Sequence, residues 1–347
     1  MIGIALVSFV AVLGKGVHDS MNNAIEKQFP AEWIVTSKNG WSGFPIAAGD
    51  AAVKAPGVSR STSIRGDRGL IGETKVNVDG VDPKTVSGLY RFEWKRGSSE
   101  ATLAELSSGG ALVKESFAKK NGLQLGEQFI LVGSGGDPVS LHVAGFYQPP
   151  RVAELLGGVI VSQSAFETAF PRAQNSFTLI DGSPTQAGLE KAVAGFPDTK
   201  VQTHAEFVKN QTSFMNSLLN LLYVLLALSV VISLFGMINT LVLSVWERTR
   251  EIGMLRAVGM TRRQTRRMVR HESVITGLIG AGLGMPVGVI LAYAVTHALS
   301  RFGVEFELSA VTLIRFVLVG VTAGTIAAIA PARRAAKLNV LEALQYE

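Results

Sequence analysis

The side chains that most often carry out chemistry in enzymes are scattered along this sequence. The chain has no cysteine, and its histidines include no pair four residues apart; they are His18, His142, His204, His271 and His297. Neither H-E-x-x-H nor G-x-S-x-G occurs, so the usual patterns of zinc proteases and serine hydrolases are missing. A phosphate-binding G-x-x-x-x-G-K-[ST] loop is missing as well. The sequence therefore predicts no catalytic residue, no metal ligand and no cofactor or ATP site in this chain.

The densest group of charges lies in residues 246–272, where eight arginines stand against three glutamates for a net charge of +5. Residues 15–209, by contrast, hold 20 basic and 20 acidic side chains and are neutral. Short loops rich in Lys and Arg stay on the cytoplasmic side of a membrane, so residues 246–272 are predicted to be a cytoplasmic loop. Because topology explains the basic charge, nucleic-acid binding is not expected.

The first half of this loop is predicted to form a short amphipathic helix. Ile252, Leu255 and Val258 recur at helical spacing, and Gly259 can end the helix in a left-handed turn. An apolar edge of this kind suits a groove on another protein better than a lipid surface.

The second half of the loop is predicted to begin another helix at Thr261, which forms a capping-box pattern with Gln264. This helix carries a basic stripe that is expected to contact lipid headgroups, made of Arg262, Arg266 and Arg270.

Long apolar segments must hold this loop at a membrane. No Asp, Glu, Lys or Arg occurs in residues 210–246, 273–300 or 316–332, and about 20 apolar residues suffice for a helix to cross a bilayer. We expect spans at residues 217–245, 273–299 and 308–330, with a cytoplasmic tail at 331–347. Residues 1–14 are predicted to be a first span that is apparently truncated, which suggests a fragment of a longer protein. Four spans place both termini in the cytoplasm.

Residues 15–212, between the first and second spans, are expected to fold as an extracytoplasmic α+β domain. Apolar patterns predict strands at residues 75–79, 129–132 and 159–161, the last two buried on both faces. Helices are predicted at residues 112–121 and 184–194, with Gly122 ending the first of them. Since no cysteine is present, this domain must rely on its own core.

Small residues recur every fourth position in two of the spans. They are Gly280, Gly284 and Gly288 in the third span, and Gly320 and Gly324 in the fourth. Such spacing lets helix backbones approach closely in lipid. Packing of the third span on the fourth within one chain and packing between two subunits explain the pattern equally well.

Three stretches of the sequence resemble the FtsX/MacB-like permeases of ABC transporters. The most specific are Arg-Glu-Ile-Gly-Met-Leu-Arg-Ala-Val-Gly-Met-Thr at 250–261 and Pro-Ala-Arg-Arg-Ala-Ala-Lys-Leu-Asn-Val-Leu-Glu-Ala-Leu at 331–344. Residues 110–126 are similar to part of that family's outer domain. The resemblance implies an α-helical integral membrane protein with four transmembrane helices and a large extracytoplasmic α+β domain between the first and second. The short first span suggests the C-terminal half of a two-repeat permease.

The resemblance also implies a function and partners. A permease of this kind sits in the plasma or inner membrane, pairs with a second permease half, and couples ATP hydrolysis by a cytoplasmic ABC ATPase to movement of its outer domain. ATP and Mg would be bound by that ATPase, and the cargo would be a lipid, lipoprotein, peptide or antibiotic. The residues expected to touch the ATPase are Arg248, Arg250, Glu251, Ile252, Leu255, Arg256 and Gly259.

Two other classes of protein stay open on the sequence alone. One is a sensor whose outer domain binds a ligand and whose loop signals to a partner other than an ATPase. The other is a membrane-anchored enzyme, which the missing nucleophile and metal patterns disfavour.

Overall fold

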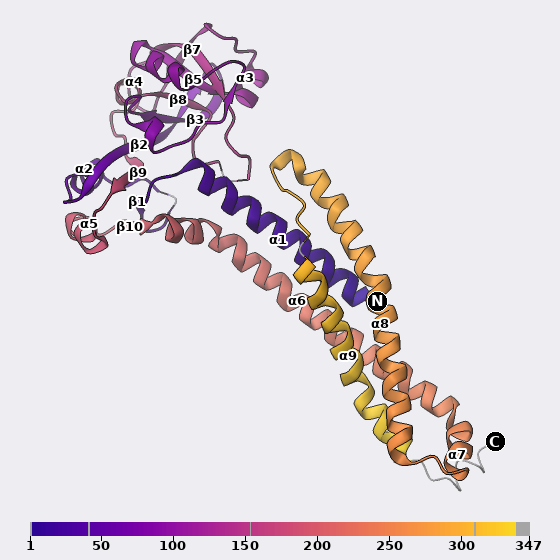
Figure 1. Cartoon of the computed structure of the whole chain (residues 1–347). Coiled ribbons are helices and arrows are strands. Elements are labelled where there is room, and N and C mark those ends of the chain that lie inside the picture. The colour runs from indigo at the N-terminus through magenta and orange to yellow at the C-terminus, as the bar shows by residue number, and fades with distance from the viewer. Residues whose placement is uncertain (1, 41, 153, 309, 338–347) are drawn as a thin grey trace. The chain divides into compact units, whose positions relative to one another are not determined.

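The computed structural model describes residues 2–40, 42–152, 154–308 and 310–337 of the chain (Figure 1). The chain divides into two compact units: a helical unit, residues up to Asp19 and from Met215 onward, and an α+β domain, Ser20–Phe214. Each unit is described by itself below.

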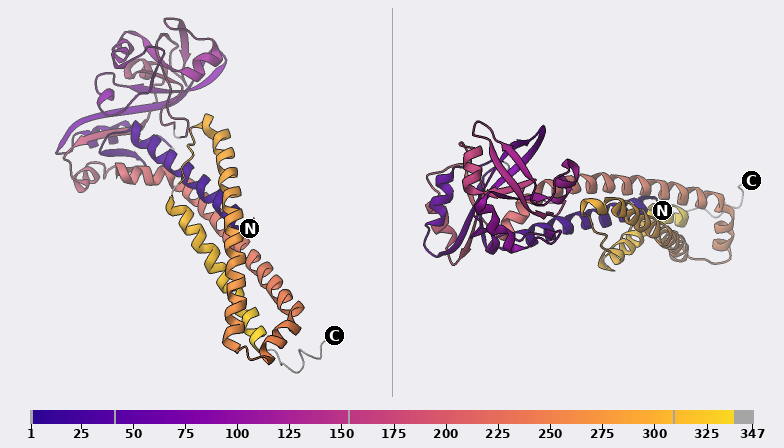
Figure 2. Two further views of the ribbon diagram at one scale, coloured as in Figure 1. Left: turned by 45° about the vertical axis from the view of Figure 1, so that its right-hand side comes forward. Right: turned by 90° about the horizontal axis from the view of Figure 1, so that it is seen from above.

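The helical unit is built from long helices joined by short connections. Its helices are α1 (Ile2–Gln28), α6 (His204–Glu247), α7 (Thr249–Ala257), α8 (Arg262–Leu299), the 3-10 turn η3 (Ser300–Phe302) and α9 (Ala310–Lys337). Helices α8 and α9 pack against each other (Figure 2). The end of α1 and the start of α6 belong to the α+β domain, so both helices continue from one unit into the other.

Helix α1 extends well beyond residue 14, where the sequence pattern placed the end of the first span. It continues to Gln28 because nothing in the segment breaks it, and an ion pair between Lys15 and Asp19, four residues apart, supports the extension. A hydropathy pattern does not detect the end of a helix that continues through polar residues.

Among the described residues, three helices are long and apolar enough to cross a membrane: Ile2–Gln28, Met215–Glu247 and Arg262–Leu299. The most apolar stretch of Met215–Glu247 has no buried residue, as expected for a helix that faces lipid. The fourth predicted span falls in α9, where several side chains lie outside the described residues, and it stays a prediction.

The α+β domain is built on one ten-stranded sheet in the order β10-β1-β9-β2-β3-β8-β5-β7-β4, with β6 pairing both β2 and β7. The strands are β1 (Trp33–Ser37), β2 (Val58–Ile71), β3 (Thr74–Val81), β4 (Trp94–Lys95), β5 (Gly110–Lys114), β6 (Gln128–Val132), β7 (Val139–Tyr147), β8 (Val159–Ser162), β9 (Asn175–Gly182) and β10 (Thr199–Thr203). Its short helices are α2 (Ile46–Val53), η1 (Val86–Gly88), η2 (Glu100–Ser108), α3 (Glu115–Asn121), α4 (Gln163–Ala169) and α5 (Gln186–Ala192).

Six of these strands close into a barrel. Strand β6 joins β2 to β7, which completes the ring β2-β3-β8-β5-β7-β6. Closure leaves these strands without a free edge, and the interior is filled by apolar side chains that include Val78, Val113 and Phe166. The first half of the long strand β2 instead pairs with β9 in the four-stranded part of the sheet, which α2 and α5 cover.

Two local predictions for this domain were wrong. Residues 112–114 form the end of strand β5, and the helix begins only at Glu115. Strand β6 alternates between exposed and buried residues, and is therefore not buried on both faces, because one of its faces lies outside the barrel. Strand β8 is buried along its whole length, and Gly122 ends α3 with a φ of 74°, as predicted.

Candidate coupling site

The connection between α6 and α8 forms the two helices that the sequence predicts. Helix α7 ends just before Gly259, whose φ of 116° requires a residue without a side chain. Thr261 then caps α8, donating its N–H to Gln264 Oε1 at 2.8 Å while its hydroxyl accepts from the Gln264 N–H at 3.3 Å. The whole connection is thus an ordered helix-turn-helix.

Helix α7 is anchored on the helical unit through Ile252, which is only 2% exposed. Its side chain belongs to a cluster with Val245 at the end of α6, Val269 of α8, and Ala332 and Ala335 of α9. Ile252 therefore packs inside this chain and does not form part of an outward apolar edge. Helical spacing predicts that Ile252, Leu255 and Val258 lie near one another on the helix surface. It does not predict which of them other helices cover.

The outer surface of α7 has the opposite character. Leu255 is 46% exposed and Val258 is 90% exposed, and Met254 lies beside them at 47%. Arg250 and Glu251 are exposed, whereas Arg256 is half-buried. This combination leaves a small apolar surface flanked by charges, which is the composition of a protein-docking helix.

An ion pair ties the start of α7 to α8. Arg248 Nη1 lies 3.4 Å from Glu272 Oε1. Both side chains are substantially exposed, so the pair contributes little stability and mainly orients the two helices.

The basic stripe of α8 lies on its exposed side. Arg262, Arg266 and Arg270 are all exposed, while Thr265 and Val269 on the opposite face are buried. The stripe is therefore free to meet anionic groups of a membrane surface.

The glycine pattern marks contacts within this chain. A Cβ on Gly288 would lie 2.4 Å from the carbonyl oxygen of Ala5, so α8 passes α1 at backbone distance. Gly324 of α9 would meet the Ser273 carbonyl of α8 at 3.0 Å, and the Ser273 hydroxyl donates to the Gly324 carbonyl at 2.6 Å.

For the other three predicted packing glycines, the structure describes fewer of the contacts. Gly284 is buried and Gly280 half-buried, and the surroundings of Gly320 lie outside the described residues. Packing within one chain therefore accounts for the glycines whose contacts the structure describes.

In the α+β domain, the ends of α1 and α6 are held by aromatic packing. The Phe29 ring lies 5.5 Å from Tyr90, 5.3 Å from Phe177 and 5.7 Å from Phe207, measured between centroids. Just before it, Gln28 accepts a hydrogen bond from the Tyr90 hydroxyl at 3.0 Å. Any displacement of α1 or α6 must therefore act on the core of the domain.

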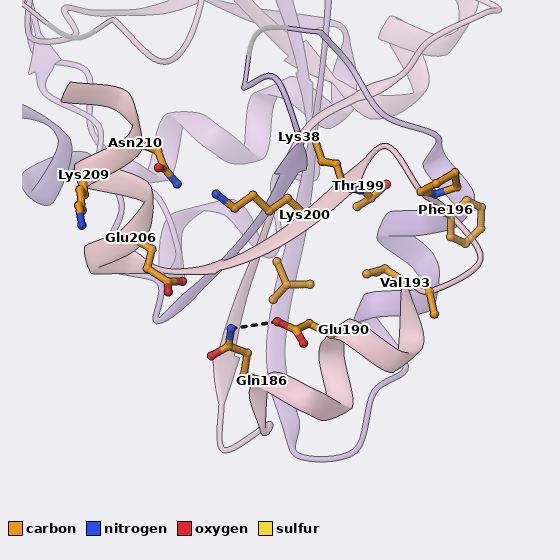
Figure 3. Close-up of a pocket in the computed structure, with 13 residues that line it drawn as sticks. Lys38, Gln186, Glu190, Val193, Phe196, Thr199, Lys200, Glu206, Lys209 and Asn210 are labelled. Atoms are coloured by element: carbon orange, nitrogen blue, oxygen red, sulfur yellow. Dashed lines mark hydrogen bonds between the residues drawn. The ribbon is translucent and has the colours of Figure 1, made fainter. Parts of the chain in front are cut away.

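A polar recess of about 540 Å³ lies where α5, β10 and the start of α6 meet (Figure 3). Lys200 lies across it toward Glu206 and Asn210, and Gln186 donates to Glu190 at 2.9 Å. The lining side chains carry charges of both signs, and the two glutamates among them, Glu190 and Glu206, are exposed.

The burial of the Asp79 side chain in the α+β domain was not predicted from the sequence. This residue is 6% exposed, and its Oδ2 accepts a hydrogen bond from the Gly157 N–H. Burial raises the pKa of the Asp79 carboxyl from 3.8 to about 7, although the Gly157 hydrogen bond acts in the opposite direction. The alternation in residues 75–79 indicates a strand with one polar face, and it could not show that Asp79 is buried while Lys75 and Asn77 on the same face are exposed.

The three long apolar helices and the large α+β domain fit a membrane protein with a large extracytoplasmic domain. Residues 1–194 match the MacB-like periplasmic core domain family, and residues 223–340 match the FtsX-like permease C-terminal family. Because the first match covers more than half of the chain, the protein belongs to the family of FtsX/MacB-like ABC transporter permeases.

Several named proteins are similar to this chain. The macrolide export ATP-binding/permease protein MacB of Chromobacterium violaceum is 33% identical over 48% of this chain and 27% of its own length. The ABC transporter permease YtrF of Bacillus subtilis is 31% identical over 44% of this chain and 37% of its own. The crystal structure of the periplasmic region of MacB from Actinobacillus actinomycetemcomitans is 14% identical, with a TM-score of 0.36, over 52% of this chain and 92% of that structure. The matched part thus spans well under half of these two curated relatives.

Proposed function

We propose that this chain is a membrane subunit that couples ATP hydrolysis by a cytoplasmic ABC ATPase to movement of its α+β domain. ATP and Mg would be bound by the ATPase. Its cargo would be a lipid, lipoprotein, peptide or antibiotic, exported or extracted from the membrane; the name of one relative, a macrolide export protein, supports export of an antibiotic. The names of relatives that combine ATP-binding and permease functions support an ATPase partner.

The observation that carries the proposal is the two-sided packing of α7. Ile252 fixes the helix to the ends of α6, α8 and α9, while Leu255 and Val258 remain exposed. A partner that binds the exposed side of α7 would therefore move the attached ends of α6, α8 and α9 with it. Since α6 is one continuous helix from Val245 back to Phe207 in the domain core, such a movement has a mechanical route to the domain.

The coupling test compares Leu255→Asp with Leu125→Asp. Leu125 is 61% exposed in the α+β domain, so it controls for the added surface charge. We expect Leu255→Asp to lower ATPase binding at least tenfold in a pull-down and to abolish stimulated hydrolysis in vesicles, because it places a charge on the docking surface.

The Leu125→Asp control should retain both binding and stimulated hydrolysis. A further variant with Gln at Arg266 and Arg270 should weaken binding to anionic vesicles by about 1 kcal/mol per charge and keep the ATPase contact. Full coupling in Leu255→Asp, together with its loss in the arginine variant, would show that the loop is a lipid anchor.

The same proposal places the α6–α8 connection and both termini in the cytoplasm of a plasma or inner membrane, with the α+β domain on the other side. It also includes a second permease half, because transport between two sides needs a pathway lined by more than this set of helices. Since the chain has no cysteine, introduced thiols report its topology cleanly.

The topology test uses Ser107→Cys in the domain and Arg267→Cys on α8, both at exposed positions. An impermeant maleimide added to intact cells should label Ser107→Cys and leave Arg267→Cys unlabelled until the cells are opened. The reverse pattern would invert the orientation. Thr265 is unsuitable as a reporter because it is fully buried.

A further inference from the structure

The largest cavity described within the α+β domain has a volume of about 1060 Å³. It lies between the end of α1, strand β3, the segment leading into β8, and β9. Ile25, Leu156 and Phe177 give it apolar walls, and Asp79 also lines it. This volume is in the range of sites that hold small organic molecules.

The Asp79 carboxyl lies in this cavity and forms no ion pair with another described residue. The one hydrogen bond that the structure gives its carboxylate comes from the backbone of Gly157, among the described residues. The Gly157 carbonyl in turn accepts from the Tyr147 hydroxyl, which fixes the peptide in place. Asparagine would accept the same backbone hydrogen bond, so nothing within the described fold makes use of the negative charge.

The charged and titratable groups around Asp79 do not neutralise it. Burial and the Gly157 hydrogen bond are the factors that set its pKa, with no contribution from a cation. Lys75 is exposed, and Lys114 is already paired with Glu154. The groups that line the cavity or interact electrostatically with the site are Asp67, Arg68, Lys75, Tyr90, Glu93, Lys114, Lys120, Tyr147 and Glu154.

A buried carboxylate that costs stability and has no ion-pair partner is typical of a functional site. A metal ion would need several oxygen or nitrogen ligands, and the described residues hold no group of three His, Cys, Asp or Glu that could supply them. Asp79 is the buried carboxylate among the residues that line the cavity, and its position beside the apolar walls suits an ammonium group attached to an apolar body.

We propose that this cavity binds a small organic amine, whose ammonium group pairs with Asp79 and whose apolar body packs against Ile25, Leu156 and Phe177. The inference goes beyond ATPase coupling, because it assigns a ligand class to the α+β domain. It stands whether or not the chain engages an ATPase.

The test uses the full chain in nanodiscs of zwitterionic lipid, with empty nanodiscs as the background. The probe is dansylcadaverine, a fluorescent primary amine, and its N-acetyl derivative is the neutral match. At pH 8 we expect the amine to bind at least tenfold more tightly than the acetylated probe. Asp79→Asn should remove this preference, and Asp50→Asn, which changes an exposed carboxylate outside the cavity, should keep it.

Acidification provides a measurement on the unaltered protein. The probe amine, with a pKa of about 10, stays protonated from pH 8 to pH 5.5. The Asp79 carboxyl, with a pKa of about 7, becomes neutral, so affinity should fall roughly thirtyfold in the wild type and stay flat in Asp79→Asn.

Equal binding of the two probes by the wild type would overturn the proposal. So would an Asp79→Asn variant that folds and binds the amine as tightly as the wild type. Tryptophan fluorescence during urea unfolding checks that the variant is folded. Because no ATPase is present, these outcomes are independent of the coupling test.

Discussion

The α+β domain and the helical unit of this chain are stabilised in opposite ways. The domain buries large side chains, with Phe29, Tyr90 and Phe177 at the centre of one core cluster. The helical unit leaves many of its large apolar residues exposed, and close contacts between its helices fall at small residues such as Gly288 and Gly324. Water drives apolar side chains inward in the domain, whereas lipid gives no such advantage and leaves close packing to hold the helices. The same type of substitution should therefore have different effects in the two units.

The largest expected effect is the loss of an aromatic side chain from the domain core. Phe29→Ala should destabilise the α+β domain by about 3–5 kcal/mol, because it removes a fully buried ring that touches three others. Urea unfolding followed by tryptophan fluorescence measures the change, since Trp33 and Trp94 pack on the domain's clusters. Ile130→Ala, at an exposed position of β6, is the control and should change stability by about 0.5 kcal/mol or less. Equal effects of the two variants would contradict this account of the core.

The second expected effect is a gain in domain stability on substitution of Asp79, and its size depends on pH. The Asp79 carboxyl has a pKa of about 7 in the folded domain and 3.8 ordinarily, so between these pH values the folded state keeps a proton that the unfolded state has lost. Stability should therefore fall as pH rises from about 4 to 7, and the penalty should be fully present above pH 7.

Asp79→Asn should remove that penalty. We expect it to raise domain stability at pH 8 by up to about 4 kcal/mol and to have little effect near pH 4. Urea titrations of both proteins at several pH values measure this. A variant that is less stable than the wild type at pH 8 would show that the charge supports the fold.

The smallest of the three effects is expected at the glycine contacts of the helical unit. Gly288→Leu should separate α8 from α1, because even a Cβ there would lie 2.4 Å from a backbone oxygen, and it should cost about 1–3 kcal/mol. Gly282→Leu is the matched control on the same helix, since a Cβ on Gly282 would meet no atom within 4 Å. Thermal unfolding in detergent, followed by circular dichroism, should separate the two variants. If Gly282→Leu lowers stability as much as Gly288→Leu, the exposed glycine face is itself an interface, in favour of contact between subunits.

The sequence by itself determined the local features of this protein. The capping pair Thr261 and Gln264, the turn at Gly259 and the turn at Gly122 depend on residues close together in the chain, and all three are found in the structure. The long apolar helices follow from composition alone, because a run without charges that is long enough to cross a bilayer is rare in any other setting.

Tertiary structure alone decided which faces are covered. Residues 112–114 have a pattern that continues naturally into the following helix, and they became strand β5 because β7 and β8 pair with them. Ile252 and Leu255 look equivalent on a helical wheel, yet only Ile252 is covered, by residues of α6, α8 and α9. Asp79 has the alternation of an ordinary strand, and its pKa is raised because its side chain is buried, whereas Lys75 and Asn77 on the same face are exposed. Burial depends on contacts between segments far apart in sequence, and a local pattern does not contain that information.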